Sequence, residues 1–185
     1  MLGADRLIKL IRNISLARMT QQGQVEGLQI QEVDGNPSVY SHWMAIILVS
    51  GSSIKLTFKT HFKTRFAQIM AANAYNLSPE KIGRDQAIDF MREFCNLTAG
   101  GTKASLLSNS INLAISLPIV TRGFDEIFFT ELLTQKSLTD HWRLAAKNCE
   151  IFCSTTIDFF ETVDLTNIEP DFVNGPRSES EIELF

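Results

Sequence analysis

The sequence predicts an α+β domain in which an antiparallel sheet packs against two long helices, with an extra amphipathic helix at the N-terminus. The chain has 185 residues, of which 44% are hydrophobic and 21% charged, as expected for one globular domain with a substantial core. Three segments carry apolar residues at three- and four-residue steps, which is typical of helices. Other segments alternate apolar and polar residues, which is typical of strands with one buried face.

The first predicted element is a helix over residues 4–19. Leu7, Leu10, Ile11 and Ile14 fall on one face of this helix, and basic residues lie between them. Such a helix packs on a core, faces a dimer partner or lies on a membrane surface, and the sequence favours the first two interpretations.

The next segments predict strands. Residues 25–33 alternate, residues 42–49 form a strongly apolar run, and residues 54–59 alternate again. Glycine and serine interrupt the chain at residues 50–53. We therefore expect a hairpin between the second and third of these segments, with one face of its second strand open to solvent.

Two helices are predicted next, over residues 62–75 and 84–107, separated by Ser78-Pro79 and Gly83. Beyond them, residues 111–117 alternate with a period of two until Pro118. A further extended segment runs through Phe128, and residues 142–160 predict a last hairpin with Lys147-Asn148 as its turn.

Charge and cysteine content exclude several classes of protein. The net charge is −4 and the isoelectric point is near 5.4, which gives no reason to expect a nucleic-acid partner. Cys95, Cys149 and Cys153 are too few and too irregular for a secreted disulfide framework, so we expect reduced thiols in a cytoplasmic protein. The apolar runs are too short for stable membrane insertion.

The negative charge is concentrated at the C-terminal end. Residues 161–185 contain seven acidic residues and one basic residue, for a formal charge of −6, which leaves +2 on the rest of the chain. We therefore expect a single domain over residues 1–160, with its core over about 42–160, followed by an acidic, flexible tail.

The predicted helix 84–107 carries the most informative pattern. On a helical wheel, Glu93 and Asn96 lie side by side because they are three residues apart, and they can reach one small target together. Gly100-Gly101 disfavours a helix by about 1 kcal/mol per glycine, so either a partner approaches closely here or the helix ends. The alternative for the whole polar face is an ordinary solvated surface. One face is apolar or small, and the opposite face is polar: Ile88, Met91, Cys95, Thr98, Ala99, Thr102 and Leu106 against Asp85, Asp89, Glu93, Asn96, Gly100 and Lys103.

These residues resemble the CheC/CheX/FliY phosphatase family of bacterial chemotaxis, closest to its single-site CheX-like branch. The shared pattern is an acidic residue followed by Glu-x-x-Asn, a glycine and a lysine along one helix, then Ser-Leu-Pro and a nearby glycine. The chain matches it from Asp89 through Glu93-Phe-Cys-Asn96 and Gly100 to Lys103, and again at residues 116–118 and 123. The resemblance covers residues 44–128, and the residues around Asn96 depart from the usual aliphatic ones.

The resemblance implies a phosphatase that acts on the aspartyl phosphate of a CheY-like response-regulator receiver. Glu93 and Asn96 would then be catalytic, Asp89, Gly100 and Lys103 would contact the receiver, and the receiver would supply the magnesium, so that this chain needs no cofactor or metal of its own. A homodimer formed through the sheets is also implied. The alternative is a non-catalytic CheX-like scaffold or regulator that binds a receiver.

Other chemistries find little support in the sequence. His42, His61 and His141 are scattered, and no pattern of a catalytic triad accompanies them. Residues 100–105 lack the spacing of a phosphate-binding loop. His141 with Cys149 and Cys153 makes a weak metal site, and buried thiols in a strand are the better interpretation.

Overall fold

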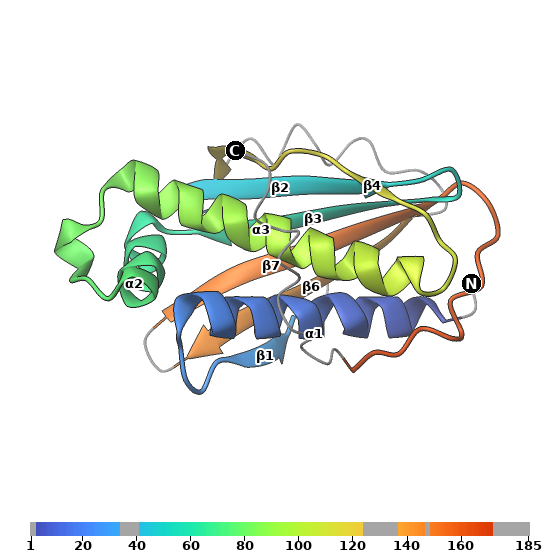
Figure 1. Ribbon diagram of the computed structural model, residues 1–185, viewed down its shortest axis with the longest axis horizontal. Helices are drawn as coiled ribbons and strands as arrows, with labels where there is room; N and C mark the ends of the chain where they lie inside the picture. The colour runs from blue at the N-terminus through green and yellow to red at the C-terminus, as the bar shows by residue number, and fades with distance from the viewer. Residues whose placement is uncertain (1–2, 34–40, 124–136, 147–148, 172–185) are drawn as a thin grey trace.

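The computed structural model describes residues 3–33, 41–123, 137–146 and 149–171. Within these ranges an antiparallel sheet of seven strands is covered on one face by two helices, α1 (Ala4–Gly23) and α3 (Arg84–Leu107), which lie side by side (Figure 1). A shorter helix, α2 (Thr64–Tyr75), packs against the first part of α3, and a 3-10 turn, η1 (Pro79–Lys81), connects the two. The predicted α+β class and the packing of helices on an antiparallel sheet are confirmed.

The strand order in the sheet is β1-β6-β7-β3-β2-β4, and β5 also pairs with β2. The hairpin predicted at residues 42–59 is confirmed, with Trp43 opposite Phe62 and Ser50 opposite Lys55. The C-terminal hairpin is also present and begins at Ser137, before the expected start. The strands are β1 (Gln29–Glu32), β2 (Trp43–Ser50), β3 (Ile54–Phe62), β4 (Ala114–Ile115), β5 (Ile119–Arg122), β6 (Ser137–Ala146) and β7 (Cys149–Phe159).

The core lies between the helices and the sheet. The apolar face of α1 is fully inside it, since Leu7, Leu10, Ile11 and Ile14 are 2% exposed or less. This burial supports the interpretation of α1 as a packed helix and not as a membrane-surface helix. The ring of Phe58 on β3 contacts Phe94 of α3 at 5.9 Å between centroids. The core thereby fixes α3 on the sheet along its length.

The polar face of β3 differs from the expectation of a wet surface. Lys59 and His61 are only 8% and 4% exposed, and Lys55 pairs with Asp158 on β7 at 2.7 Å. Because the neighbouring strands present polar and aromatic side chains in register, this face is covered although its sequence alternates.

The expected boundary at residue 160 is also wrong in position. Leu165 and Ile168 are 1% exposed, so the chain after β7 contributes to the core. The side chain of Asn13 on α1 donates to the carbonyl oxygen of Pro170 at 3.0 Å. Residues 161–171 therefore pack against α1, because two apolar side chains in an acidic segment suffice to anchor it. Residues 172–185, the rest of the expected tail, lie outside the described residues.

An ion-pair cluster ties α1 to the sheet. The guanidinium of Arg12 binds both carboxylate oxygens of Asp140 on β6, at 2.8 and 2.6 Å, and Glu32 on β1 at 2.6 Å. The hydrogen bonds that Arg12 donates to the Asp140 carboxylate are the main reason that the pKa of Arg12 is raised. The cluster fixes the position of α1 along its axis, and through α1 it supports α3.

Candidate functional site

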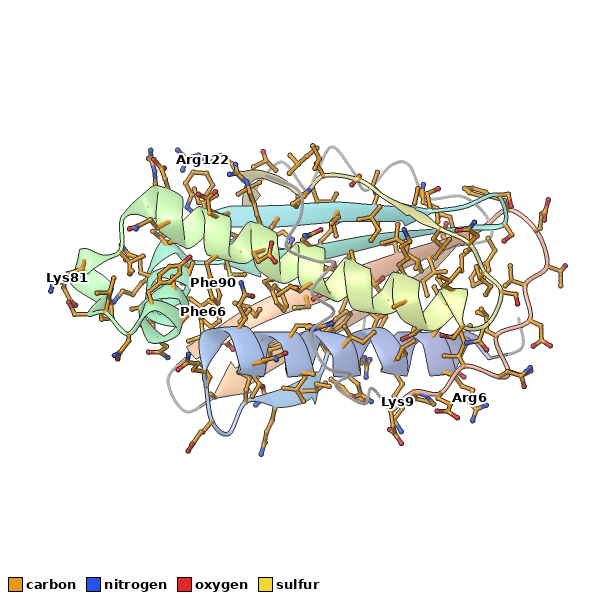
Figure 2. The ribbon with its side chains drawn as sticks, viewed as in Figure 1. Arg6, Lys9, Phe66, Lys81, Phe90 and Arg122 are labelled. Atoms are coloured by element: carbon orange, nitrogen blue, oxygen red, sulfur yellow. The ribbon has the colours of Figure 1, made fainter. Side chains whose placement is uncertain are left out.

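Helix α3 carries the candidate site. The buried face of α3 packs in the core and holds the helix in place. Phe90 and Phe94 are buried with the predicted apolar stripe, of which Ile88 alone is half-buried. Thr98 and Thr102 donate their hydroxyl hydrogens to the carbonyl oxygens four residues earlier, each at 2.9 Å, so that polar side chains fit the buried face. Figure 2 labels Phe90 where α3 packs on α2, beside the labelled Phe66.

The opposite face of α3 carries the predicted site residues. Asp89, Glu93 and Asn96 are exposed, and Gly100 and Lys103 are half-buried. Within the described ranges, the side chains of Glu93 and Asn96 have no hydrogen bond or ion pair. The structure therefore places an acid and an amide next to each other on a rigid helix, with their polar atoms available to a partner.

Asp89 has a different environment from Glu93. Arg92, which is not part of the predicted site, donates to the Asp89 carboxylate at 2.6 Å, and both side chains stay largely exposed. The three-residue spacing was the available signal for this pair. Asp89 is thus partly neutralised on its own helix, which leaves Glu93 as the acidic group of the face that is free to pair with a cation.

The structure shows whether the helix ends at Gly100. The helix continues through Gly100-Gly101 to Leu107, so the interpretation of Gly100 as a helix end is wrong. A Cβ atom at Gly100 would meet nothing within 4 Å. Packing against the described part of the chain therefore gives no reason for a glycine here, and the flat surface that it leaves beside Asn96 is open to an incoming backbone.

The Ser-Leu-Pro segment forms a bulge in the edge strand next to α3. Ile115 pairs with Val49 and Ile119 with Ile46, so three residues of the edge oppose two residues of β2. The Oγ of Ser116 accepts a hydrogen bond from the Leu48 N–H at 3.0 Å, which closes the gap in the ladder. Proline is tolerated here because an edge strand needs no N–H on its outer side.

The end of this edge strand contains a feature that the sequence pattern does not reveal. Arg122 lies opposite Trp43 in the sheet, with its guanidinium carbon Cζ 4.3 Å from the centroid of the Trp43 ring. The next residue, Gly123, passes so close to Ser41 that a Cβ atom would overlap the Ser41 carbonyl oxygen. Only glycine fits this approach, which sets the end of the strand and hence the position of Arg122.

Among the described residues, the other candidate groups do not form a catalytic centre. Cys95 and Cys153 are fully buried, and burial raises the pKa of Cys153 to about 12 and that of Cys95 well above its usual value. Both are therefore neutral thiols at neutral pH and poor nucleophiles. Among the residues that the structure describes, no group of three or more histidine, cysteine or acidic side chains is arranged to hold a metal ion. In the same part of the chain, no helix is long and apolar enough to cross a membrane.

Solved structures share this arrangement of helices and sheet. A CheC-like superfamily protein from Shewanella sp. PV-4 superposes with a TM-score of 0.67 at 14% identity, covering 83% of this chain and 97% of that protein. The CheX of a CheX–CheY–BeF3–Mg²⁺ complex from Borrelia burgdorferi gives 0.64 at 13% identity, covering 82% and 97%. FliY from Thermotoga maritima gives 0.52 at 11% identity, covering 86% and 92%. At these identities the likeness defines the class of fold, which is CheC-like.

Sequence comparison identifies the family within this class. The family described as chemotaxis phosphatase CheX matches residues 43–136, which is half of the chain. No curated protein sequence matches the chain. The chain belongs to the CheX family of chemotaxis phosphatases, as the resemblance in its sequence predicted.

Proposed function

We propose that this chain is a phosphatase that hydrolyses the aspartyl phosphate of a CheY-like receiver domain in bacterial chemotaxis or another two-component pathway. The observation that carries the proposal is the exposed Glu93–Asn96 couple on α3, whose side chains have no partner among the described residues, in a chain of the CheX family. One solved relative, from Borrelia burgdorferi, is a CheX bound to CheY with BeF3 and Mg²⁺. Such a receiver is cytoplasmic, and so, we propose, is this chain.

In the proposed reaction, a water molecule attacks the phosphorus atom in line with the bond to the aspartyl oxygen. That bond breaks, its electron pair returns to the aspartate carboxylate, and inorganic phosphate leaves after the water has lost a proton to solvent. An acyl phosphate is already reactive, so the main need is a correctly placed water molecule. The Asn96 carboxamide can orient this water, because its amide carries both a hydrogen-bond donor and an acceptor and projects from a rigid helix.

The neighbouring groups of α3 have roles in docking. Glu93 pairs with a lysine of the receiver through a charge-assisted hydrogen bond. Gly100 lets the receiver backbone approach the helix, since no described residue fills the space above it. Lys103 and the Asp89–Arg92 pair border the contact. The receiver holds the magnesium ion, so no metal ligand is required from this chain.

Phosphate release from a phosphorylated receiver tests the proposal. We expect Asn96→Ala to lower the rate of dephosphorylation by about 100-fold, as for the loss of one positioned polar group in other active sites. Glu93→Ala should mainly weaken binding, by about tenfold, because it removes one charge-assisted contact. Asn112→Ala, an exposed asparagine outside α3, is the matched control and should behave as the wild type.

Two experimental outcomes would distinguish a phosphatase from a non-catalytic scaffold. Equal rates for the wild type and Asn96→Ala with every receiver of the source organism would exclude the catalytic role. Binding of the BeF3-activated receiver without acceleration of hydrolysis would instead identify a CheX-like scaffold or regulator.

We also propose that the chain forms a homodimer through its sheet. Apolar side chains are exposed at the bulged edge, with Leu48 at 39%, Leu117 at 82% and Ile119 at 63%. A cluster of this kind is unusual on a monomer surface and suits a protein interface.

A further inference from the structure

The candidate site on α3 has a cation at its border that the proposed reaction does not use. Arg122 ends β5, and Trp43 is its cross-strand partner. Paired residues share a face of the sheet, and Trp43 lies on the same face as Ala45 and Ile47, which are buried in the core under the helices. Arg122 thus projects from the sheet on the side of α3, and α3 contacts β5 directly. Figure 2 shows Arg122 beside the N-terminal half of α3.

The position of the Arg122 guanidinium is fixed by its neighbours. It lies over the Trp43 ring, with Cζ 4.3 Å from the ring centroid. The indole N–H of Trp43 donates to the Oγ1 of Thr64 at 3.0 Å, so the ring is itself held by the first turn of α2. A guanidinium that stacks on a fixed ring keeps its edge, and the N–H donors along it, free for a ligand.

The charges around Arg122 indicate what it can bind. In the described part of the chain no carboxylate lies within ion-pair distance of Arg122, and Asp89 on α3 already pairs with Arg92. Lys103, on the same face of α3, has no ion pair in these ranges either. The border of the site is therefore basic, although the whole chain has a net charge of −4. A pre-positioned arginine that has no acidic partner among the described residues suits a carboxylate of a docked protein.

We propose that Arg122, stacked on Trp43, binds a carboxylate of the docked receiver and so acts as a second contact point beside the Glu93–Asn96 couple. This inference rests on the proposed function. A pocket that holds a divalent cation and an aspartyl phosphate is lined by acidic side chains, so its rim offers such carboxylates. Glu93 and Arg122 then present opposite charges to the receiver, and two opposite contacts define one orientation of docking.

The experiment measures affinity and turnover separately. The full chain and its variants are titrated against BeF3-activated CheY-like receivers of the source organism, and kcat is measured with the same receivers after phosphorylation by acetyl phosphate. We expect Arg122→Ala to raise the Kd about fivefold at low salt with kcat unchanged, because the charge pair lies at the rim. The difference in Kd between the wild type and Arg122→Ala should become smaller as salt is added, because salt screens the charge pair. Arg122→Lys keeps the charge but not the planar stack, so its Kd should lie between those of the wild type and Arg122→Ala.

A matched control removes the same charge elsewhere. Arg143 is an exposed arginine on β6, far from α3 in the strand order, and Arg143→Ala should leave Kd and kcat unchanged. If the wild type is active and Arg122→Ala matches Arg143→Ala, the inference is overturned while the proposed function stands. A fall in kcat at constant Kd would also overturn it, because it would place Arg122 at the phosphoryl group. If the wild type neither binds nor dephosphorylates any receiver, the proposed function fails and the inference fails with it.

Discussion

At the scale of single residues, we expect Gly100 to lower the stability of the protein while it favours receiver binding. No neighbouring atom of the described residues requires a glycine there, and glycine in a helix costs about 1 kcal/mol relative to alanine. We expect Gly100→Ala to raise the free energy of unfolding by about 0.5–1 kcal/mol and yet to raise the KM for a phosphorylated receiver severalfold. Urea denaturation and phosphate release measure the two effects.

The control for this prediction stabilises the same helix on another side. Ser105 is half-buried and lies away from the Glu93–Asn96 face. Ser105→Ala should also stabilise α3, but it should leave KM as in the wild type. If Gly100→Ala is stabilised and fully active, no close approach to Gly100 takes place.

The sequence predicts residues of the site where one helix arranges them. The periodicity of residues 84–107 was enough to place Glu93, Asn96 and Gly100 on one face, because a helix of known register fixes relative positions by itself. Arg122 could not be found in this way, because its stacking on Trp43 depends on a pairing between strands about 80 residues apart in the chain. Residues brought together by the sheet need the structure.

At the scale of elements, the position of α1 depends on one ion pair more than on the other. Arg12 contacts Asp140, whose side chain is 14% exposed, and Glu32, whose side chain is 77% exposed. We expect Asp140→Ala to lower the free energy of unfolding by about 2 kcal/mol, because it leaves the guanidinium with little solvent and one partner fewer. Glu32→Ala should cost about 0.5 kcal/mol or less. Urea unfolding of the two variants gives both values.

Replacing both Arg12 and Asp140 distinguishes two causes of lower stability, namely the loss of their attraction and the burial of an unpaired charge. The double variant Arg12→Met and Asp140→Leu should recover a part of the stability lost in Asp140→Ala, because it leaves no unpaired charge near the core. Equal losses in Asp140→Ala and Glu32→Ala would show that Asp140 has no special part in fixing α1.

Local elements could be predicted from the sequence, whereas distant contacts could not. The hairpin of β2 and β3 has its turn between its strands, and α3 has its own periodicity, so both were predicted close to their observed bounds. The pairing of β1 with β6 and the burial of Leu165 and Ile168 join distant parts of the chain. Their local signals are a short alternation and two isolated apolar residues, which do not specify a partner.

At the scale of the whole molecule, the two faces of the bulged edge suit different proposed functions, receiver docking on the side of α3 and dimer formation on the opposite side. Arg122 and Trp43 lie on the side of α3. Leu48 alternates with the buried Ile47 and Val49, so it projects from the opposite face, and Ile119 projects with its partner Ile46. An interface formed around Leu48 and Ile119 would therefore leave the Glu93–Asn96 face of α3 free for a receiver.

This division gives a prediction about assembly. We expect the wild type to sediment as a dimer at micromolar concentrations in analytical ultracentrifugation, and Ile119→Glu to shift it to monomer, since burying a carboxylate in an apolar interface is costly. Leu77→Glu places the same charge at an exposed leucine after α2 and should leave the dimer intact. Because Leu48 and Ile119 project from the face opposite α3, the monomeric variant should keep the phosphatase activity of the wild type. A wild type that stays monomeric would contradict the proposed interface, and a monomeric variant without activity would show that the site needs the second copy.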